Sequence, residues 1–247
     1  MSIRGNVALI TGASRGIGAA IARSLAAQGA SVAVNYHASE AAAQAVVADI
    51  RQAGGVALAV KGDARDRDQI EAVAATVKKE LGPIGLLVLN ASIGFPMKGF
   101  LEYPWEAFEA KLRGEMGAAF HGCRAVVPQM LERKGGSIVA ITSGLARNPG
   151  WGFCAHSAAK ASLEGFVRAL AFELGPMGIR VNAVAPGLTL TDATAHLPEK
   201  HKQAAADHTP LRRNGQAEDV AEAVAGLLQT GFVTGATLPV NGGGYIF

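Results

Sequence analysis

Residues 7–18 read VALITGASRGIG, and this stretch decides the fold. Four apolar residues, Val7 to Ile10, predict a buried strand, the glycines after it permit a tight turn, and an apolar helix is expected over Ala19 to Ala27. Glycines in such a turn let backbone amides approach a pyrophosphate, which then faces the positive end of the helix. The spacing is G-x-x-x-G-x-G rather than the commoner G-x-G-x-x-G. A glycine-rich turn without a ligand is the alternative, but the order of strand, glycines and helix favours a phosphate-binding loop.

Short apolar runs alternate with helical patterns along the rest of the chain. The helical segments place apolar residues at i, i+3, i+4 and i+7, and Pro128 predicts a kink or local break in one of them. The apolar runs predict strands over Val7 to Ile10, Val32 to Val34, Val56 to Val60, Leu86 to Leu89, Ile138 to Ile141, Ile179 to Val184 and Thr237 to Val240. Most are apolar on both faces, as in a parallel sheet covered by helices on each side. We therefore expect an α/β fold, a doubly wound Rossmann domain whose seven-stranded parallel sheet is flanked by helices.

The composition excludes several classes of protein. The chain has 247 residues, 49% of them apolar and 17% charged, so it is not a disordered tail protein. A net charge of +3 without a long basic run argues against a nucleic-acid partner. No uncharged apolar stretch reaches the ~18 residues of a membrane span. Two cysteines, Cys123 and Cys154, are too few for a secreted disulfide scaffold, and we expect a soluble cytoplasmic protein.

The octet Thr11 to Gly18 resembles the cofactor loop of the short-chain dehydrogenase/reductase family, and the resemblance covers essentially the whole chain. It is closest to bacterial 3-oxoacyl-(acyl carrier protein) reductase-like members. Further matching segments follow in the family's order: Asp63 to Asp66, Leu89 to Ser92, Pro186-Gly187 with Thr191, and Thr234 to Gly243. The resemblance implies a single domain over residues 1–247 with a variable substrate segment at about 188–212.

The resemblance also implies a nicotinamide cofactor and its contact residues. These are Gly12, Ser14, Arg15, Gly16, Ile17, Gly18, Asn35, Tyr36, Asp63, Ala64, Asn90, Ala91, Lys160, Pro186, Gly187 and Thr191.

The end of the second strand bears on which nicotinamide is bound. An acid there usually holds the 2′-hydroxyl of NAD, whereas this strand ends Asn35-Tyr36-His37 with no acid before Glu40. Arg15 lies in the glycine loop, where NADP-preferring members of the family often carry a basic residue. NADP(H) is therefore favoured over NAD(H); the alternative is that Arg15 only faces solvent.

The reaction site is expected at the exit of the fifth strand. That strand delivers Ser143, and the following helix carries His156 and Lys160, whose i, i+4 spacing places both on one face. The family's pattern is Tyr-x-x-x-Lys, so His156 stands where the tyrosine is expected. Glu115 occupies the place of the asparagine of the family's proton relay, and Ser92 that of a glycine.

In the family the serine hydrogen-bonds the substrate oxygen, the tyrosine transfers its proton and the lysine holds the nicotinamide ribose. By this resemblance Ser143, His156, Lys160 and Glu115 are the catalytic residues of an NADP(H)-dependent oxidoreductase. Its substrate is a ketone, of 3-oxoacyl or polyketide-like type, reduced to an alcohol with His156 as proton donor. Lys160 disfavours an imidazolium and a nearby Glu115 favours it, and the sequence leaves that balance open.

Two further functions remain open at this point. One is a lyase, isomerase or dehydratase in which His156 and Glu115 move protons; the other is a catalytically inactive NADP(H)-binding module. A third possibility, Cys154 as a nucleophile, lacks any supporting oxyanion motif.

The remaining predictions concern the substrate pocket, partners and assembly. Phe95, Trp151 and Phe153 are expected to line an apolar pocket, or else to be core residues. The partner is a small-molecule or acyl-linked substrate, with no nucleic acid and no membrane. In the family two helices pair between subunits, which implies a homotetramer or a homodimer. No metal site is expected from the spacing of the other histidines, His121, His196, His201 and His208.

Overall fold

A computed structural model of the chain describes residues 2–246. Seven parallel strands form the main sheet in the order β3-β2-β1-β4-β5-β6-β9. They are β1 (Val7–Ile10), β2 (Ser31–Tyr36), β3 (Val56–Lys61), β4 (Ile84–Leu89), β5 (Gly136–Ile141), β6 (Ile179–Pro186) and β9 (Thr237–Val240). Each predicted strand is confirmed, with ends that differ by at most two residues. The doubly wound parallel sheet of a single α/β domain is therefore confirmed.

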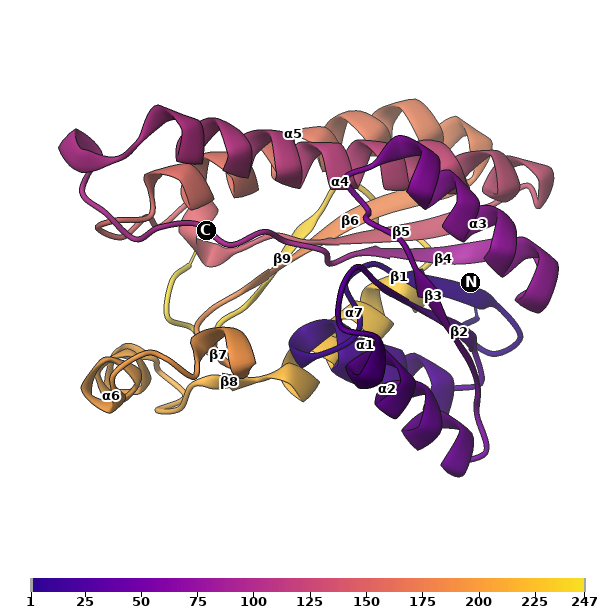
Figure 1. Cartoon of the computed structure of the whole chain (residues 1–247), viewed down its shortest axis with the longest axis horizontal. Helices are drawn as coiled ribbons and strands as arrows, with labels where there is room; N and C mark the ends of the chain where they lie inside the picture. The colour runs from indigo at the N-terminus through magenta and orange to yellow at the C-terminus, as the bar shows by residue number, and fades with distance from the viewer. Residues whose placement is uncertain (1, 247) are drawn as a thin grey trace.

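Two layers of helices cover the sheet, one on each face (Figure 1). One layer holds α1 (Gly16–Ala27), α2 (Glu40–Gln52) and α7 (Ala217–Gln229). The other holds α3 (Arg67–Leu81), α4 (Trp105–Glu132) and α5 (Cys154–Leu174). Because both faces are covered, β1 and β4 are buried at every position, which is why their sequences are apolar throughout.

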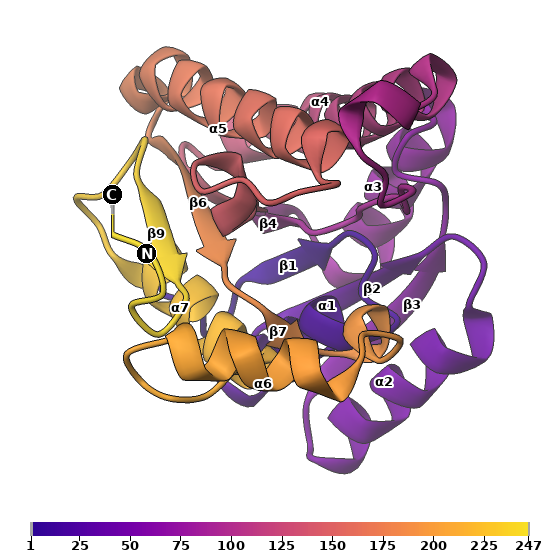
Figure 2. The same ribbon diagram turned by 90° about the vertical axis from the view of Figure 1, so that its left-hand side faces the viewer.

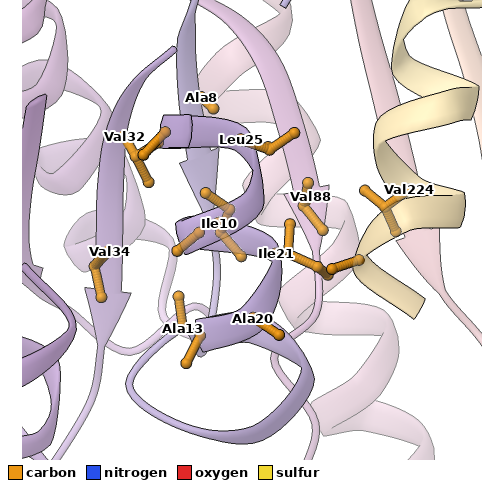
Figure 3. Close-up of a cluster of buried hydrophobic side chains, with 14 of the residues drawn as sticks. Ala8, Ile10, Ala13, Ala20, Ile21, Leu25, Val32, Val34, Val88 and Val224 are labelled. Atoms are coloured by element: carbon orange, nitrogen blue, oxygen red, sulfur yellow. The ribbon is translucent and has the colours of Figure 1, made fainter. Parts of the chain in front are cut away.

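The core under α1 fixes the glycine loop that precedes this helix. Ile21 and Leu25 of α1 point toward Ile10 of β1 and Val88 of β4, and Val224 of α7 closes the group from the side (Figure 3). All five side chains are fully buried. Burying one such side chain stabilises the fold by about 1.5–3 kcal/mol, so this cluster holds the start of α1 firmly against the strand exits.

The sequence predicts a kink or a local break at Pro128, and the predicted break is wrong. Helix α4 runs continuously from Trp105 through Pro128 to Glu132. Because Pro128 lies close to the end of the helix, its missing N–H removes one hydrogen bond and the helix still completes its last turn.

The sequence patterns did not reveal the small elements beyond the carboxyl ends of the strands. They are a short parallel pair, β7 (Thr189–Leu190) with β8 (Gly215–Gln216), and helix α6 (Glu199–His208), which lie together at the lower left of Figure 1. Figure 2, with this side turned to the viewer, shows α6 in front of α1 and α7. These small elements fall in and just after the segment expected to vary with substrate. Four 3-10 turns complete the fold: η1 (Phe100–Glu102), η2 (Gly144–Ala146), η3 (Gly175–Met177) and η4 (Asp192–Thr194). Within residues 2–246, none of the helices has the length and apolar character to cross a bilayer.

Candidate active site

The glycine loop between β1 and α1 has room only for glycine at two of its positions. A Cβ on Gly12 would lie 2.9 Å from the Cα of Ala91, and one on Gly18 would lie 2.7 Å from the carbonyl oxygen of Gly12. Gly16 adopts a φ of +54°, in the left-handed region that favours glycine, and Thr191 lies against it. The first turn of α1 carries no acidic residue, and its N-cap Arg15 makes no side-chain capping bond. The cradle therefore fits an anionic pyrophosphate held by backbone amides.

A cavity of about 600 Å³ extends from this cradle along the switch point between β1 and β4. Of the predicted cofactor residues it is lined by Gly12, Ser14, Arg15, Asn35, Tyr36, Asp63, Ala64, Asn90 and Ala91. Gly16, Ile17, Gly18, Lys160, Pro186, Gly187 and Thr191 lie outside its lining. The cavity therefore gathers the residues expected at the adenosine and pyrophosphate parts of a dinucleotide.

Two of the lining residues brace the cradle with their side chains. The Nδ2 of Asn35 donates to the carbonyl oxygens of Val60 and Gly62, and its Oδ1 lies 3.4 Å from the donating N–H of Gly12. The Nδ2 of Asn90 donates to the carbonyl oxygen of Gly12 at 2.9 Å. Both amides are thus occupied by the backbone, so these residues shape the cavity rather than offer side-chain donors to a ligand.

The end of β2 brings together basic and hydroxyl groups. The guanidinium of Arg15 donates a hydrogen bond to Ser39, which precedes α2. Asp63 Oδ2 accepts a hydrogen bond from Arg65 Nη2 at 2.6 Å and lies 3.6 Å from His37 Nδ1. The hydrogen bonds from Arg65 lower the pKa of the Asp63 carboxyl. Asp63 is thus engaged by Arg65, while burial and the nearby carboxylate of Glu40 raise the pKa of Tyr36 at the end of β2.

Ser143 and Lys160 meet at the exit of β5. Lys160 Nζ donates to the carbonyl oxygen of Ile141 at 2.7 Å, so the ammonium lies beside the strand that delivers Ser143 two residues later. Ser143 starts the turn η2, and its Oγ accepts a hydrogen bond from the N–H of Leu145 at 3.2 Å. Lys160 is 4% exposed, whereas Ser143 is half-buried.

Glu115 lies between two ammonium groups, one of which the sequence analysis missed. Its Oε2 accepts a hydrogen bond from Lys111 Nζ at 2.7 Å, and its Oε1 forms an ion pair with Lys160. The hydroxyl of Ser92 donates to the same Oε2 at 3.1 Å. Burial alone would raise the pKa of Glu115, but Lys160 and Lys111 lower it to about 2. Glu115 is therefore a fixed carboxylate.

His156 lies between aromatic rings and these charges. Phe95 stacks on the imidazole with centroids 4.8 Å apart, and Phe153 meets its edge at 6.3 Å. The Nδ1 atom is buried and makes no hydrogen bond. Burial, followed by the ammonium groups of Lys160 and Lys111, lowers the pKa of His156 to about 4, against the opposing effect of Glu115. The balance left open by the sequence thus favours the uncharged imidazole.

Comparisons with known proteins show the family to which the chain belongs. A family model described as enoyl-(acyl carrier protein) reductase matches residues 12–244. The 3-oxoacyl-[acyl-carrier-protein] reductase FabG of Pseudomonas aeruginosa is 40% identical over 254 aligned positions that cover 100% of both chains. FabG of Staphylococcus aureus is 37% identical and covers 97% of this chain and 98% of its own. The chain belongs to the short-chain dehydrogenase/reductase family.

Two solved structures of the family are also similar over nearly their full length. A 7α-hydroxysteroid dehydrogenase, complexed with NADH and 7-oxo glycochenodeoxycholic acid, superposes with a TM-score of 0.93 at 38% identity, covering 98% of this chain and 95% of that one. A dehydrogenase/reductase from Sinorhizobium meliloti has a TM-score of 0.92 at 38% identity and covers 99% and 97% of the two chains. This member of the short-chain dehydrogenase/reductase family is therefore an oxidoreductase.

The structure separates the aromatic residues expected at the substrate pocket of this reductase. Phe95 and Phe153 lie together beside His156, with ring centroids 5.8 Å apart. Trp151 is 76% exposed and lies against Gly99, outside that group. Cys154 begins α5 as a free thiol and Cys123 is buried, where burial raises its thiol pKa to about 12. Among residues 2–246, His, Cys, Asp and Glu side chains do not form a group of three or more that could hold a metal ion.

Lys111 is the charged residue of this site that sequence reasoning missed. Its spacing of four from Glu115 is a helical ion-pair signal that was available. The same signal is more common on solvated helix faces, and it gave no indication that both side chains are buried.

Proposed function

We propose that the protein is an NADP(H)-dependent reductase that converts a ketone into an alcohol. The hydrogen bond from Lys160 to Ile141 carries the proposal, because Ile141 precedes Ser143 by two residues at the carboxyl end of β5, and the glycine cradle also opens at the carboxyl ends of the strands. The relatives named above are 3-oxoacyl reductases, and the steroid dehydrogenase holds a 7-oxo compound. Both kinds of compound carry a ketone, which supports this substrate class.

The preference for the phosphorylated cofactor rests on Arg15. Its guanidinium, hydrogen-bonded to Ser39, stands beside the end of β2 where a 2′-phosphate would extend. Asp63, the acidic residue in the cavity lining, is paired with Arg65, which reduces its repulsion of a phosphate. A bidentate guanidinium suits a phosphate better than a hydroxyl, which favours NADPH over NADH.

In the proposed reaction the reduced nicotinamide, when bound, supplies the hydride, and the chain supplies orientation and a proton. The Ser143 hydroxyl binds the carbonyl oxygen, and Lys160 holds the ribose with the N–H that neither Ile141 nor Glu115 occupies. His156 donates its proton to the developing alkoxide as imidazolium. With a pKa of about 4, about one imidazole in a thousand is protonated at pH 7, so reduction is fastest in acid. The reverse oxidation needs the neutral imidazole and is therefore favoured at pH values above the pKa of His156.

A second candidate is reduction of a carbon–carbon double bond conjugated to a carbonyl. It is favoured by the uncharged state of His156 beside two lysines and one carboxylate. Hydride addition to the β-carbon moves the π electrons to the carbonyl oxygen, and the α-carbon of the resulting enolate then takes a proton from water. Such an enolate is less basic than an alkoxide and needs no strong acid at oxygen, whereas a net positive site stabilises it.

One assay distinguishes the two candidates. NADPH and NADH consumption is followed over matched ketones and enones between pH 5 and 9, with the acid-catalysed loss of NADPH subtracted, and products are identified by mass and NMR. Ketone reduction that rises toward pH 5 supports the first proposal. Reduction of the double bond alone, without that rise, supports the second. Turnover without nicotinamide oxidation would favour a non-redox lyase or isomerase, and silence despite NADPH binding would leave only a binding module.

We further propose a homotetramer. Large apolar side chains are exposed on α4 and α5, including Phe120 at 49% and Phe172 at 86%. Exposed apolar patches of this kind mark protein–protein contacts. Light scattering coupled to size exclusion tests the proposal, since a monomer in solution would contradict it.

A further inference from the structure

Lys111 is a buried cation that the proposed reaction does not use directly. It is 1% exposed and is among the largest fully buried side chains of residues 2–246. Its Nζ donates to Glu115 Oε2 at 2.7 Å, to the carbonyl oxygen of Ile93 at 2.8 Å and to Ser92 Oγ at 3.0 Å. Three acceptors around one nitrogen require three N–H bonds, so Lys111 is an ammonium with no donor left for a ligand.

The charges that face His156 come from two helices and sum to +1. Lys160 follows His156 by four residues on α5, while Lys111 and Glu115 come from α4. Two ammonium groups thus oppose one carboxylate. The other groups against the imidazole are the uncharged rings of Phe95 and Phe153. Lys111 is the cation that can be replaced without removing the proposed contact between Lys160 and the ribose.

Lys111 also reaches the ring that covers the histidine. Its Nζ lies 5.3 Å from the centroid of Phe95, within the range of a cation–π contact, and Phe95 in turn stacks on His156. One side chain therefore touches both the carboxylate that pairs with Lys160 and the ring that shields the imidazole from water.

We propose that Lys111 is a positioning residue of this site: it holds Glu115 against Lys160 and Phe95 against His156, and its ammonium opposes a second positive charge on the imidazole. The inference rests on the proposed role of His156 in proton transfer. It adds that a residue of α4 that touches neither cofactor nor substrate shifts the pH range of the reaction, alongside burial and Lys160.

The test is a charge cycle read on His156 itself. The imidazole midpoint is measured by NMR on histidine-labelled protein, with the signal assigned through His156→Gln. Lys111→Met lowers the local charge from +1 to 0 and should move the midpoint upward by about one pH unit. Glu115→Gln raises the charge to +2 and should move it downward. The double variant returns the charge to +1, so its midpoint should lie near that of the parent protein.

Arg113→Met is the matched control, because Arg113 lies two residues from Lys111 on α4 with its side chain 80% exposed. It should leave the midpoint unchanged. Equal midpoints in Lys111→Met and the parent, with NADPH affinity retained, would overturn the proposal. If Lys111→Met does not fold, Glu115→Gln and the double variant decide, since an unchanged midpoint in Glu115→Gln also contradicts it.

The same cycle separates this inference from the proposed function. If the His156 midpoint shifts with the local charge but the protein never oxidises NADPH, the role of Lys111 is supported and the proposed reductase activity is contradicted. If the protein oxidises NADPH with the same pH profile in the parent and in all three variants, the reductase activity is supported and the role of Lys111 is contradicted.

Discussion

The ring of Phe95 lies nearly parallel to the imidazole of His156, with centroids 4.8 Å apart and planes inclined by 23°. Phe95 belongs to the loop between β4 and α4, and His156 to the first turn of α5, so the contact joins segments far apart in sequence. Water is excluded from that face of the imidazole. Since burial is the largest cause of the low pKa of His156, an uncharged ring controls how much acid the site holds.

Phe95→Ala should therefore shift ketone reduction toward neutral pH. Removing the ring admits water to the imidazole and moves the pKa of His156 from about 4 back toward its ordinary value of 6.5. At pH 6 the rate of NADPH oxidation should rise by about tenfold for the first unit of that recovery, and by less for each further unit as the imidazole becomes mostly protonated. Trp151→Ala, which removes an exposed ring, is the control and should keep the parent profile. A parent-like pH profile in Phe95→Ala would contradict this explanation.

His156→Tyr should extend reduction to higher pH if the position alone limits the reaction. A phenol has a pKa of about 10 and stays protonated where the imidazole does not. Because Phe95 stacks on His156, the larger ring must displace it, at a stability cost of about 1–3 kcal/mol. We expect the rate at pH 8 to exceed the parent's by at least about tenfold. His156→Phe is the control, because it has an aromatic ring but no proton to donate. A rate equal to that of His156→Tyr would show that the phenol does not act as the proton donor.

Arg15→Ala should weaken NADPH binding without affecting NADH. The loss of one charge-assisted contact to a phosphate corresponds to a Kd about 10- to 100-fold higher. Fluorescence titration with both cofactors measures the ratio. Arg23→Ala, on the exposed side of α1 where Arg23 pairs with Asp49, is the matched control. Equal losses for NADPH and NADH would assign Arg15 to the shared part of the cofactor.

The sequence predicts the strands and the glycine cradle well because each is written as a short local pattern. A buried parallel strand is apolar at every position, as β1 shows, and the glycine spacing follows it directly, although Ala91, the residue that leaves no room for a side chain at Gly12, is distant in sequence. Asn35 is different. Its position beside the cofactor cavity follows from the fold, but its amide bonds to Val60 and Gly62, which no local pattern indicates.

The protonation state of the site lies beyond local patterns for the same reason. The fixed charge of Glu115 depends on Lys111 from the same helix and on Lys160 from the next. The burial of Lys111 depends on Ser92 and Ile93, which follow β4. Only their meeting in three dimensions shows that Glu115 is held ionised, and so cannot serve as the acid of a non-redox reaction at neutral pH.

His156 should also make folding stability depend on pH. Its pKa is lowered on folding from 6.5 to about 4, so below pH 6.5 the unfolded chain binds a proton that the folded chain does not. The contribution is complete above pH 6.5 and is lost as the pH falls toward 4, by about 3 kcal/mol in total. Urea unfolding from pH 7 to 4.5 should show a smaller loss in His156→Phe than in the parent. His208→Gln, an exposed histidine at the end of α6, should behave like the parent. Parallel curves for the parent and His156→Phe would mean that His156 is not buried in neutral form.

Gly144→Ala tests whether the C-terminal tail supports Ser143. Gly144 follows Ser143 directly, and a Cβ there would overlap the ring of Tyr245, whose hydroxyl donates to the carbonyl oxygen of Ala185 at 3.1 Å. Because a ring held at its far end gives way less easily than a flexible chain, we expect a loss of about 1–3 kcal/mol in unfolding free energy. A reduced kcat with unchanged NADPH affinity should accompany it, since the strain falls next to Ser143 rather than in the cradle. Tyr245→Ala in the same chain removes the overlap and should restore part of both losses. If Gly144→Ala is as stable and active as the parent, or if the second change brings no recovery, the tail does not hold the exit of β5 in place.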